Sequence, residues 1–357
     1  MKKDNKNITL SVVDAKSIAE QVPLYEERLV QKKPYISYGA DNKFPQFLFE
    51  TYTKSAILQS IVNGTTNYVM GDGIDTSLTI VNDEGETIDD VVKKITTDYL
   101  IFGGFAIDVI RDSNMDVKQI YWLDFAKVRL DKDGKTAYYS NGFGKFGSSM
   151  VSYPVFDSKK KEPHSVFYFR GHKTRSLYPI CLYNGALNAI LTSIEISKFH
   201  LNAILNNFNV SAIINFNNGT VTDEYADVIE NKIKEKFCSA DNASKFMLIF
   251  NDSKEHATEV TRLTEDNFDA KYEALRNDTI NEIFVAFGAT PTLFGLPLSN
   301  IGFNSQEFSE AYELYNKIMI IPLQNDIKRS FNAIYDQEDI ITFKPFTIYN
   351  GEEGGVI

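Results

Sequence analysis

Two long helical segments that enclose a compact insert constrain the fold more than any other feature of this sequence. Within residues 178–208, apolar side chains recur at every seventh position, at Ile180, Leu187, Ile194, Leu201 and Phe208. A narrow apolar seam of this kind predicts one long helix, of roughly 40 Å at about 1.5 Å per residue. A second amphipathic helix is predicted for residues 265–287, with an apolar face that includes Phe268, Leu275, Ile283 and Phe284.

The insert between these helices has the pattern of a strand, a helix and a second strand. Residues 209–216 (NVSAIINF) and 245–250 (KFMLIF) are the predicted strands. The helix between them is predicted to begin at Thr222, a good N-cap followed by acidic residues, and to end near Phe237. Two stalks with a knob between them favour one wedge of a ring, in which neighbouring subunits bury the faces that a single chain leaves open.

The remaining segments mix helices with short strands, so the fold class is α+β. Residues 41–69 predict a helix around Pro45 that ends near Gly71 or Gly73. From about residue 99 to 170, the pattern predicts three hairpins, at residues 105–124, 127–139 and 153–169. A third long helix is predicted to start at Asn304 with a capping box to Glu307, to kink at Pro322 and to continue through Ile334.

Residues 287–296, FGATPTLFGL, join the second long helix to the third. Glycine and proline turn the chain, so the helix is expected to stop here. Phe287, Leu293, Phe294 and Leu296 are too apolar for a solvated loop. We therefore expect this decapeptide to pack against its own chain and a neighbouring subunit, as the anchor of a loop whose polar continuation is LSNIGFN.

Composition excludes several classes of function. A net charge of −11 argues against a protein that grips phosphates with a basic face, although DNA passing nearby without being held stays possible. Two cysteines predict no disulfide framework, and no apolar run approaches the roughly 18 residues of a membrane span. The N-terminus has no signal-peptide pattern, so we expect a soluble protein made in a reducing cytoplasm.

No set of residues with catalytic or metal-binding spacing is visible in the sequence. The four histidines fall in different predicted elements, and no HExxH or CxxC motif occurs. The glycine-rich stretch at 142–149 lacks the ending of a phosphate-binding loop, and the Asp89-Asp90 pair fits a solvated helix start. The sequence therefore predicts no catalytic residues, no metal site and no cofactor, and favours a structural or assembly role.

The segment from 268 to 332 resembles the hallmark region of tailed-bacteriophage portal proteins, the head–tail connector ring subunits. Their pattern is close to E-I-x-x-x-F-G-x-P-P-x-L-x-G, followed by a Ser-Asn motif and a helix that ends in a proline. The matching residues, of which the motif residues are taken as structural, are Glu282, Ile283, Phe287, Gly288, Pro291, Leu293, Gly295, Ser299, Asn300 and Pro322. Thr290 stands where the family more often has its first proline.

The resemblance implies a portal-like fold in which long stem helices flank a small βαβ clip and are joined to a β-rich and helical wing. It divides the chain into segments with distinct roles. These are a flexible N-terminal arm (1–34), a wing (35–175), stem helices (176–208 and 264–287), a clip (209–263), a tunnel loop (288–304), a wing or crown helix (305–340) and a C-terminal tail (341–357).

In functional terms the resemblance implies a ring, of twelve subunits, at one capsid vertex. Such a ring is the channel through which double-stranded DNA is packaged and ejected. Its implied partners are the major capsid protein, the large subunit of the terminase and head–tail adaptor proteins, with no membrane. The protein would reside in the virion after assembly in the host cytoplasm. The candidates to face DNA are Ser299, Asn300, Gly302 and Asn304.

Two other interpretations remain open from the residues alone. One is a different phage head–tail connector or a minor capsid protein. The other is a cytoplasmic α+β enzyme whose site has no recognisable motif. Native mass and appearance in the electron microscope separate a ring from both.

Overall fold

The computed structural model of the protein describes residues 26–29, 33–143, 147–171, 176–205, 213–216, 247–250, 268–296 and 305–347. The chain divides into two compact units: the larger comprises Met1–Leu191 with Ile280–Ile357, and the smaller comprises Thr192–Thr279. The chain leaves the larger unit within helix α5 (Leu187–Leu205) and returns to it within helix α7 (Phe268–Ala286). The smaller unit is therefore an insertion into the larger one.

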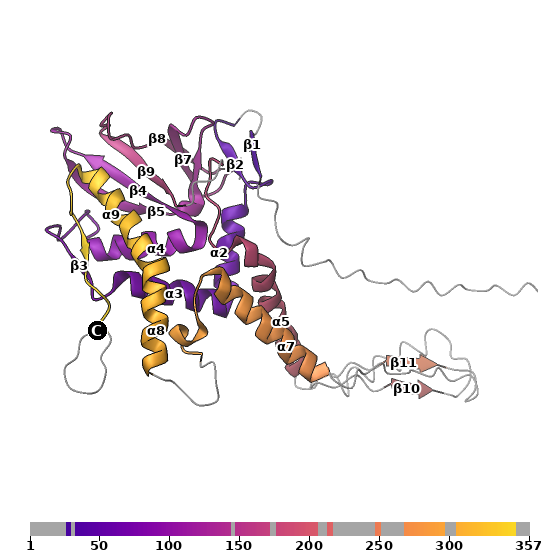
Figure 1. The fold of residues 1–357 in the computed structure, drawn as a ribbon. Coiled ribbons are helices and arrows are strands. Elements are labelled where there is room, and N and C mark those ends of the chain that lie inside the picture. The colour runs from indigo at the N-terminus through magenta and orange to yellow at the C-terminus, as the bar shows by residue number, and fades with distance from the viewer. Residues whose placement is uncertain are drawn as a thin grey trace, which may run out of the picture. The chain divides into compact units, whose positions relative to one another are not determined.

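A three-stranded antiparallel sheet lies within the larger unit (Figure 1). Its central strand is β4 (Gly104–Arg111), which pairs with β5 (Val117–Leu123) on one side and with β9 (His164–Arg170) on the other. Helix α4 (Ile88–Phe102) runs directly into β4 and packs against it. The first hairpin is confirmed, because β4 and β5 are consecutive and antiparallel.

A second sheet consists of β6 (Val128–Leu130), β7 (Thr136–Ser140) and β8 (Met150–Pro154), in that order. The β6–β7 hairpin is also confirmed. Its turn is stabilised by Asp131, whose Oδ1 accepts from the Lys135 amide at 2.7 Å. Gly134 has a φ of 66°, a left-handed conformation that glycine adopts at little cost.

The third predicted hairpin, at residues 153–169, is wrong. Strand β8 pairs with β7, whereas β9 pairs with β4 in the other sheet. The two strands do contact each other, because the Tyr153 ring packs on His164 with centroids 3.9 Å apart, but no strand ladder joins them. Just after β8, Val155 forms an isolated parallel bridge to Val166 of β9. Both strands have the alternation that a hairpin needs, but the choice of partner is set by the buried strand β4, which is distant in sequence.

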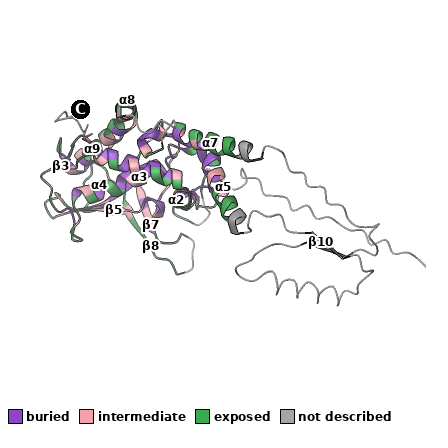
Figure 2. Cartoon of the chain, turned by 90° about the horizontal axis from the view of Figure 1, so that it is seen from below, coloured by how far each residue is buried: buried purple, intermediate pink, exposed green. Residues whose placement is uncertain are grey.

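Helices α2 (Phe44–Lys54) and α3 (Ala56–Met70) replace the single helix predicted for residues 41–69. The break is at Ser55, whose backbone is extended and whose side-chain oxygen accepts from the Leu58 amide at 3.3 Å, capping α3. The predicted end is confirmed, since Gly71 is the C-cap of α3. Helix α3 packs against α4, and the buried residues of both helices are purple in Figure 2.

The Asp89-Asp90 pair does lie at a helix start. Thr87 is the N-cap of α4, and its side chain accepts from the Asp90 amide while Asp90 Oδ2 accepts from the Thr87 amide at 2.9 Å. The two carboxylates therefore stand where the helix dipole favours negative charge.

The first long helix begins later than the sequence seam predicts. Residues 178–183 are not helical, a short 3-10 turn η2 (Asn184–Ala186) follows, and α5 starts at Leu187. Tyr178 explains the delay, because its amide donates to Glu27 Oε1 at 2.7 Å and its hydroxyl donates to the Ile36 carbonyl at 2.6 Å. These contacts hold the chain extended beside an N-terminal pair of strands, β1 (Glu27–Leu29) and β2 (Ile36–Tyr38). Strand β1 lies within the predicted N-terminal arm, and β2 lies where that arm joins the predicted wing.

The C-terminal helix is interrupted where the kink was predicted. Helix α8 (Ser305–Tyr315) passes through a π-helical turn, η5 (Asn316–Ile320), into α9 (Ile321–Tyr335), and Pro322 occupies the first turn of α9. Proline has no N–H to donate and its ring obstructs the preceding turn, which accounts for the irregular turn. Beyond α9, strand β12 (Thr342–Phe343) pairs with β3 (Ile74–Asp75), so part of the predicted tail belongs to the fold.

In the smaller unit, β10 (Ile213–Phe216) pairs in parallel with β11 (Met247–Phe250). Parallel pairing is what the predicted strand–helix–strand pattern requires. The predicted helix from Thr222 to Phe237 lies outside the described residues.

Asp98 is a buried carboxylate in the core between α4 and the sheet. Its Oδ2 accepts from Trp122 Nε1 at 2.8 Å and from the Phe125 amide at 3.3 Å. Desolvation is the dominant effect and raises the pKa of Asp98 well above its ordinary value, in spite of these two hydrogen bonds. The protonated form is therefore favoured by folding.

The substitution Asp98→Asn tests this burial. A raised folded-state pKa contributes stability that is present below the unfolded value of about 3.9 and is lost as the pH rises through the folded value. We therefore expect the stability of the Asp98→Asn variant relative to the native chain to increase from about pH 4 upwards. Urea unfolding at a series of pH values measures the difference. A pH-independent difference would show that Asp98 stays ionised in the fold.

Candidate functional site

The segment that joins α7 to η4 (Pro291–Phe294) is the most tightly built connection near the predicted tunnel loop. We call residues 287–296 the loop anchor. Helix α7 ends in overlapping turns, in which the amides of Gly288 and Ala289 donate to the carbonyls of Val285 and Phe284, both at 3.0 Å. Gly288 has a φ of 58°, so the chain leaves the helix through a left-handed residue.

A single 3-10 turn then closes the anchor. Pro291 starts η4, where a missing N–H costs little, and Gly295 ends it with a φ of 81°. The Leu296 amide donates back to the Pro291 carbonyl at 3.1 Å. The glycines and the proline of the motif therefore determine the backbone path, as the sequence predicts for this decapeptide.

The apolar side chains of the anchor pack into the larger unit. Phe287 is fully buried and stacks on Tyr183, with ring centroids 5.5 Å apart. Tyr183 in turn donates its hydroxyl to the Ile101 carbonyl near the end of α4, at 2.9 Å. Leu293 is buried as well, whereas Leu296 is exposed. Except for Leu296, the large apolar side chains of the anchor thus pack against their own chain.

Phe294 sits directly on the backbone of α3. A Cβ atom added to Gly64 would lie 2.7 Å from two carbons of the Phe294 ring, so only glycine leaves room for this packing. The ring also contacts the rings of Phe284, Tyr68 and Tyr315, at centroid separations of 5.7, 6.0 and 6.1 Å. The anchor is therefore inserted into an aromatic cluster formed by three helices.

Two tyrosine hydroxyls connect this cluster by hydrogen bonds. Tyr68 donates to the Leu293 carbonyl at 2.6 Å, and the hydroxyls of Tyr315 and Thr65 are 2.7 Å apart. Burial is the main cause that raises the pKa of Tyr68 and of Tyr315, so both hydroxyls stay protonated. Tyr68 is thus a permanent donor to the anchor.

A side-chain bond links the anchor to α8, across residues 297–304. The Thr292 hydroxyl donates to Glu307 Oε1 at 3.3 Å, and Glu307 lies in the first turn of α8. The sequence assigns Glu307 to a capping box with Asn304, but Asn304 lies outside the described residues. Glu307 bonds the first turn of α8 to the anchor, and its capping box with Asn304 stays a prediction.

The motif residues divide into two groups. Ile283, Phe287 and Leu293 are buried, and Gly288, Pro291 and Gly295 shape the turn, whereas Glu282 and Pro322 are exposed. The candidates to face DNA, namely Ser299, Asn300, Gly302 and Asn304, lie outside the described residues. The structure therefore brings together the buried and the turn-forming residues of the motif.

Sequence reasoning missed the partners of the anchor. Gly64 and Tyr68 lie four residues apart on α3, which places them on one face of the helix. The available signal was Gly64 itself, because a glycine within a helix lowers the stability of the helix and therefore suggests that something packs closely against it. Nothing in the sequence indicates that the partner is Phe294, more than 200 residues away.

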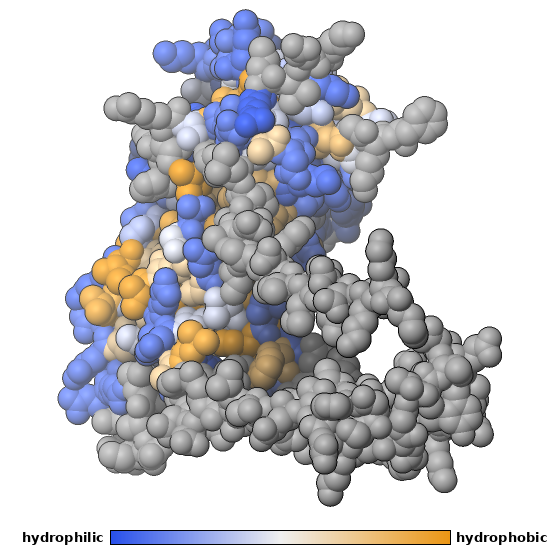
Figure 3. Space-filling view, turned by 90° about the vertical axis from the view of Figure 1, so that its right-hand side faces the viewer, coloured by the Kyte–Doolittle hydropathy of each residue, from blue (hydrophilic) through white to orange (hydrophobic). Residues whose placement is uncertain are grey.

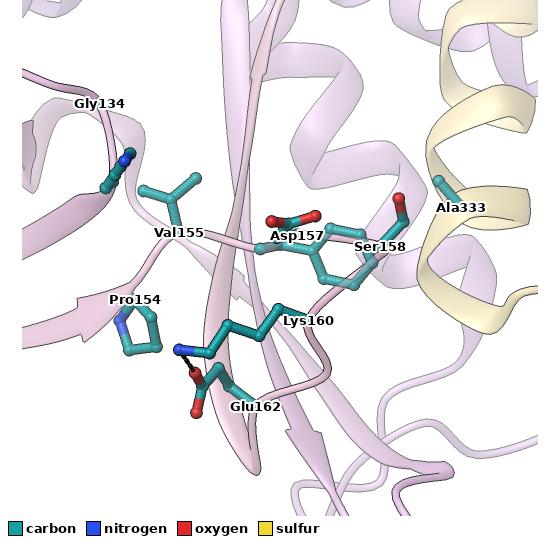
Figure 4. Close-up of a pocket in the computed structure, with 10 residues that line it drawn as sticks. Gly134, Pro154, Val155, Asp157, Ser158, Lys160, Glu162 and Ala333 are labelled. Atoms are coloured by element: carbon teal, nitrogen blue, oxygen red, sulfur yellow. Dashed lines mark ion pairs between the residues drawn. The ribbon is translucent and has the colours of Figure 1, made fainter.

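An open hollow lies elsewhere in the larger unit, between the turn at Gly134, the chain from Pro154 to Glu162 and Ala333 of α9 (Figure 4). Its volume is about 630 Å³. Polar groups that line it bond to near neighbours in the sequence: Lys160 pairs with Glu162 at 2.5 Å, and Asp157 Oδ1 accepts from the Lys159 amide at 2.9 Å. Figure 4 shows Lys160 directed towards Glu162. We assign no ligand to this hollow.

Within the described ranges, no group of three or more His, Cys, Asp or Glu side chains has the geometry of a metal site. Among the helices of those same ranges, none is both long enough and apolar enough to span a membrane.

Several solved structures share this fold. A chain in the neck of the native gene transfer agent particle, computed with C12 symmetry, matches with a TM-score of 0.58 and 13% identity over 94% of this chain and 89% of that one. A chain in the virion of the native gene transfer agent particle matches with a TM-score of 0.56 and 15% identity over 84% and 83%. An HK97 family phage portal protein from Corynebacterium diphtheriae matches with a TM-score of 0.50 and 15% identity over 83% and 94%.

These likenesses, with the helices and the anchor, define an α+β protein of the portal fold. No curated protein matches the chain. The family model described as "Phage portal protein" matches residues 81–345, which is most of the chain. The protein belongs to the phage portal protein family.

The substitution Gly64→Ala tests the contact between α3 and the anchor. Alanine is the better helix former, yet its methyl group would overlap the Phe294 ring. We expect a net loss of about 1–3 kcal/mol in the free energy of unfolding, as for other overpacked cores. Chemical denaturation measures it.

The double variant Gly64→Ala with Phe294→Leu is the control. A smaller side chain at 294 makes room for the methyl group, so the two losses should be less than additive. Strictly additive losses would mean that Phe294 does not lie on Gly64 in solution.

Proposed function

We propose that this chain is the subunit of a portal ring at one vertex of a capsid, through which double-stranded DNA is packaged and later ejected. The observation that carries the proposal is the loop anchor. It bonds to both elements that flank residues 297–304: Tyr68 donates to Leu293 of η4, and Thr292 donates to Glu307 in the first turn of α8. A channel that DNA slides through needs a lining that the subunit holds in place, and this lining should not be basic, because a basic patch would hold the phosphates.

We assign the elements to the parts of a portal as follows. Residues 35–175 form the wing, α5 and α7 are the stem helices, and residues 209–263 form a βαβ clip for the packaging motor. Residues 288–304 are the tunnel loop, and Ser299, Asn300, Gly302 and Asn304 are its DNA-facing residues. The helix through α8 and α9 leads into the wing or a short crown.

Ring formation would cover an exposed apolar patch beside the anchor. The patch consists of Val285 on α7 together with Leu314, Ile318 and Ile321 on the C-terminal helix, which are between 41% and 75% exposed. Gly288 joins its two parts, since a Cβ at Gly288 would be 3.2 Å from Ile318 Cδ1. On the face of the molecule that Figure 3 draws, apolar side chains reach the surface in separate patches among hydrophilic ones. Neighbouring copies in a closed ring bury such patches.

The remaining parts of the proposal follow from this role. The ring would contact the major capsid protein, the large subunit of the terminase and head–tail adaptor proteins. It would assemble in the host cytoplasm and remain in the virion. The protein would act as a structural channel without catalysis of its own. The negative charge of the chain is compatible with DNA that passes without being retained.

Native mass tests the ring. Twelve copies of the 40.5 kDa chain give a particle of about 0.5 MDa, which light scattering and negative-stain images identify. Leu314→Glu with Ile318→Glu places two charges in the patch and is expected to shift the protein towards monomers. Ile80→Glu is the matched control, because Ile80 is at least as exposed but lies outside the patch. A native chain that is a monodisperse monomer would refute the proposal.

A second experiment tests the loop. Replacement of residues 297–304 by a Gly/Ser segment of equal length keeps the chain length while removing the side chains. We expect rings of normal mass that package or retain DNA several-fold less well, and the Ser299→Ala, Asn300→Ala variant should lie in between. If the rings do not assemble, the segment belongs to the subunit contacts and does not line a channel.

A further inference from the structure

The chain beyond α9 returns to the corner between α3 and β3 and is fastened there. We call residues 342–347 the C-terminal strap. Strand β12 pairs with β3, and the Lys344 amide donates to the Gly73 carbonyl at 2.9 Å (Figure 1). The Thr347 hydroxyl donates to the Asp72 carboxylate, and the Thr347 amide contacts the same carboxylate at 3.4 Å. The strap is therefore held at both of its ends.

Gly71 makes this close approach possible. A Cβ atom at Gly71 would lie 2.1 Å from the Lys344 carbonyl oxygen, so the strap passes directly over the backbone at the end of α3. A backbone atom cannot move aside as the tip of a side chain can. The end of α3 and the strap are thus fitted to each other, and the position of residue 346 follows from that fit.

Phe346 places its ring against Tyr68 of the aromatic cluster and against Tyr312 of α8. Its centroid is 5.2 Å from that of Tyr68, at an interplanar angle of 84°, and 5.7 Å from that of Tyr312. Tyr68 donates to the Leu293 carbonyl on one side of residues 297–304, and Tyr312 lies on α8 on the other side. The tyrosine rings also contact each other, at 5.5 Å. Phe346 therefore contacts both the tyrosine that bonds to the anchor and a tyrosine of the helix that follows residues 297–304.

We propose that Phe346 is a positioning residue for the loop anchor: the C-terminal strap holds its ring against both Tyr68 and Tyr312 and thereby determines where the anchor and α8 stand relative to each other. Edge-to-face aromatic packing of this kind adds about 0.5–1.5 kcal/mol beyond burial and restricts ring orientation. The Tyr68 ring must keep its orientation for the hydroxyl to reach Leu293. The consequence for DNA rests on the proposed function, whereas the positioning itself is a property of the single chain.

Amide hydrogen exchange on the full-length chain tests the positioning. The reporters are the amides of Leu293, Gly295 and Leu296, which donate within the anchor turn. In Phe346→Ala we expect them to exchange about tenfold faster, while amides of β4 keep their native rates, because only the anchor loses a support. Phe346→Tyr should restore near-native rates. Lys344→Ala, at an exposed side chain of the same strap, is the control that should change nothing.

Coupling to Tyr68 separates positioning from general stability. Tyr68→Phe removes the bond to Leu293, so adding Phe346→Ala to it should produce a smaller further increase than Phe346→Ala produces alone. Phe346→Leu, which keeps an apolar side chain of similar size, serves if the alanine variant does not fold, and it should raise the same three rates. Unchanged anchor rates in that variant, or an equal rise in β4, would overturn the proposal. Amide exchange can be measured without portal assembly and without DNA. This result is therefore independent of whether the chain forms a portal.

Discussion

The contact between the Phe294 ring and the backbone of Gly64 is the constraint on which the anchor depends. The Phe294 ring lies 2.7 Å from where a Cβ of residue 64 would stand, so glycine at this position lets η4 pack closely on α3. At that separation the Tyr68 hydroxyl, one turn along α3, reaches the Leu293 carbonyl. The fit of one glycine to one phenylalanine thus brings the end of α7, the middle of α3 and the end of α8 into a single cluster.

The proposed function requires a firm body that carries a short DNA-facing segment. In this chain the firm part is built from aromatic rings and two tyrosine hydroxyls, and charged groups play little part in it. Aromatic packing is weakened little by salt, in contrast to surface ion pairs, which are screened. The many Phe and Tyr residues in the composition are therefore accounted for in part by this cluster, and in part by the core around β4.

Local signals in the sequence were sufficient for the elements that local chemistry decides. The Asp-Gly turn of β6–β7, the end of α3 at Gly71 and the irregularity before Pro322 were predicted, because each depends on the residue that occupies it. The break at Ser55 and the late start of α5 were missed. In both, a side chain bonds in a way that the apolar periodicity does not reveal: Ser55 caps a new helix, and Tyr178 is held by Glu27. The family motif predicted the backbone of the anchor but not its partners.

The sequence by itself determined the α+β class, the inserted unit between two long helices and the turn chemistry of the loop anchor, since these follow from residue type and spacing along the chain. The tertiary structure alone decided that β8 and β9 belong to different sheets, that Phe294 packs on Gly64 and that Phe346 closes the aromatic cluster. Each of these depends on which distant surfaces fit together. The hydrophobic attraction between side chains has no direction and is compatible with many partners, so only the assembled backbone selects one of them.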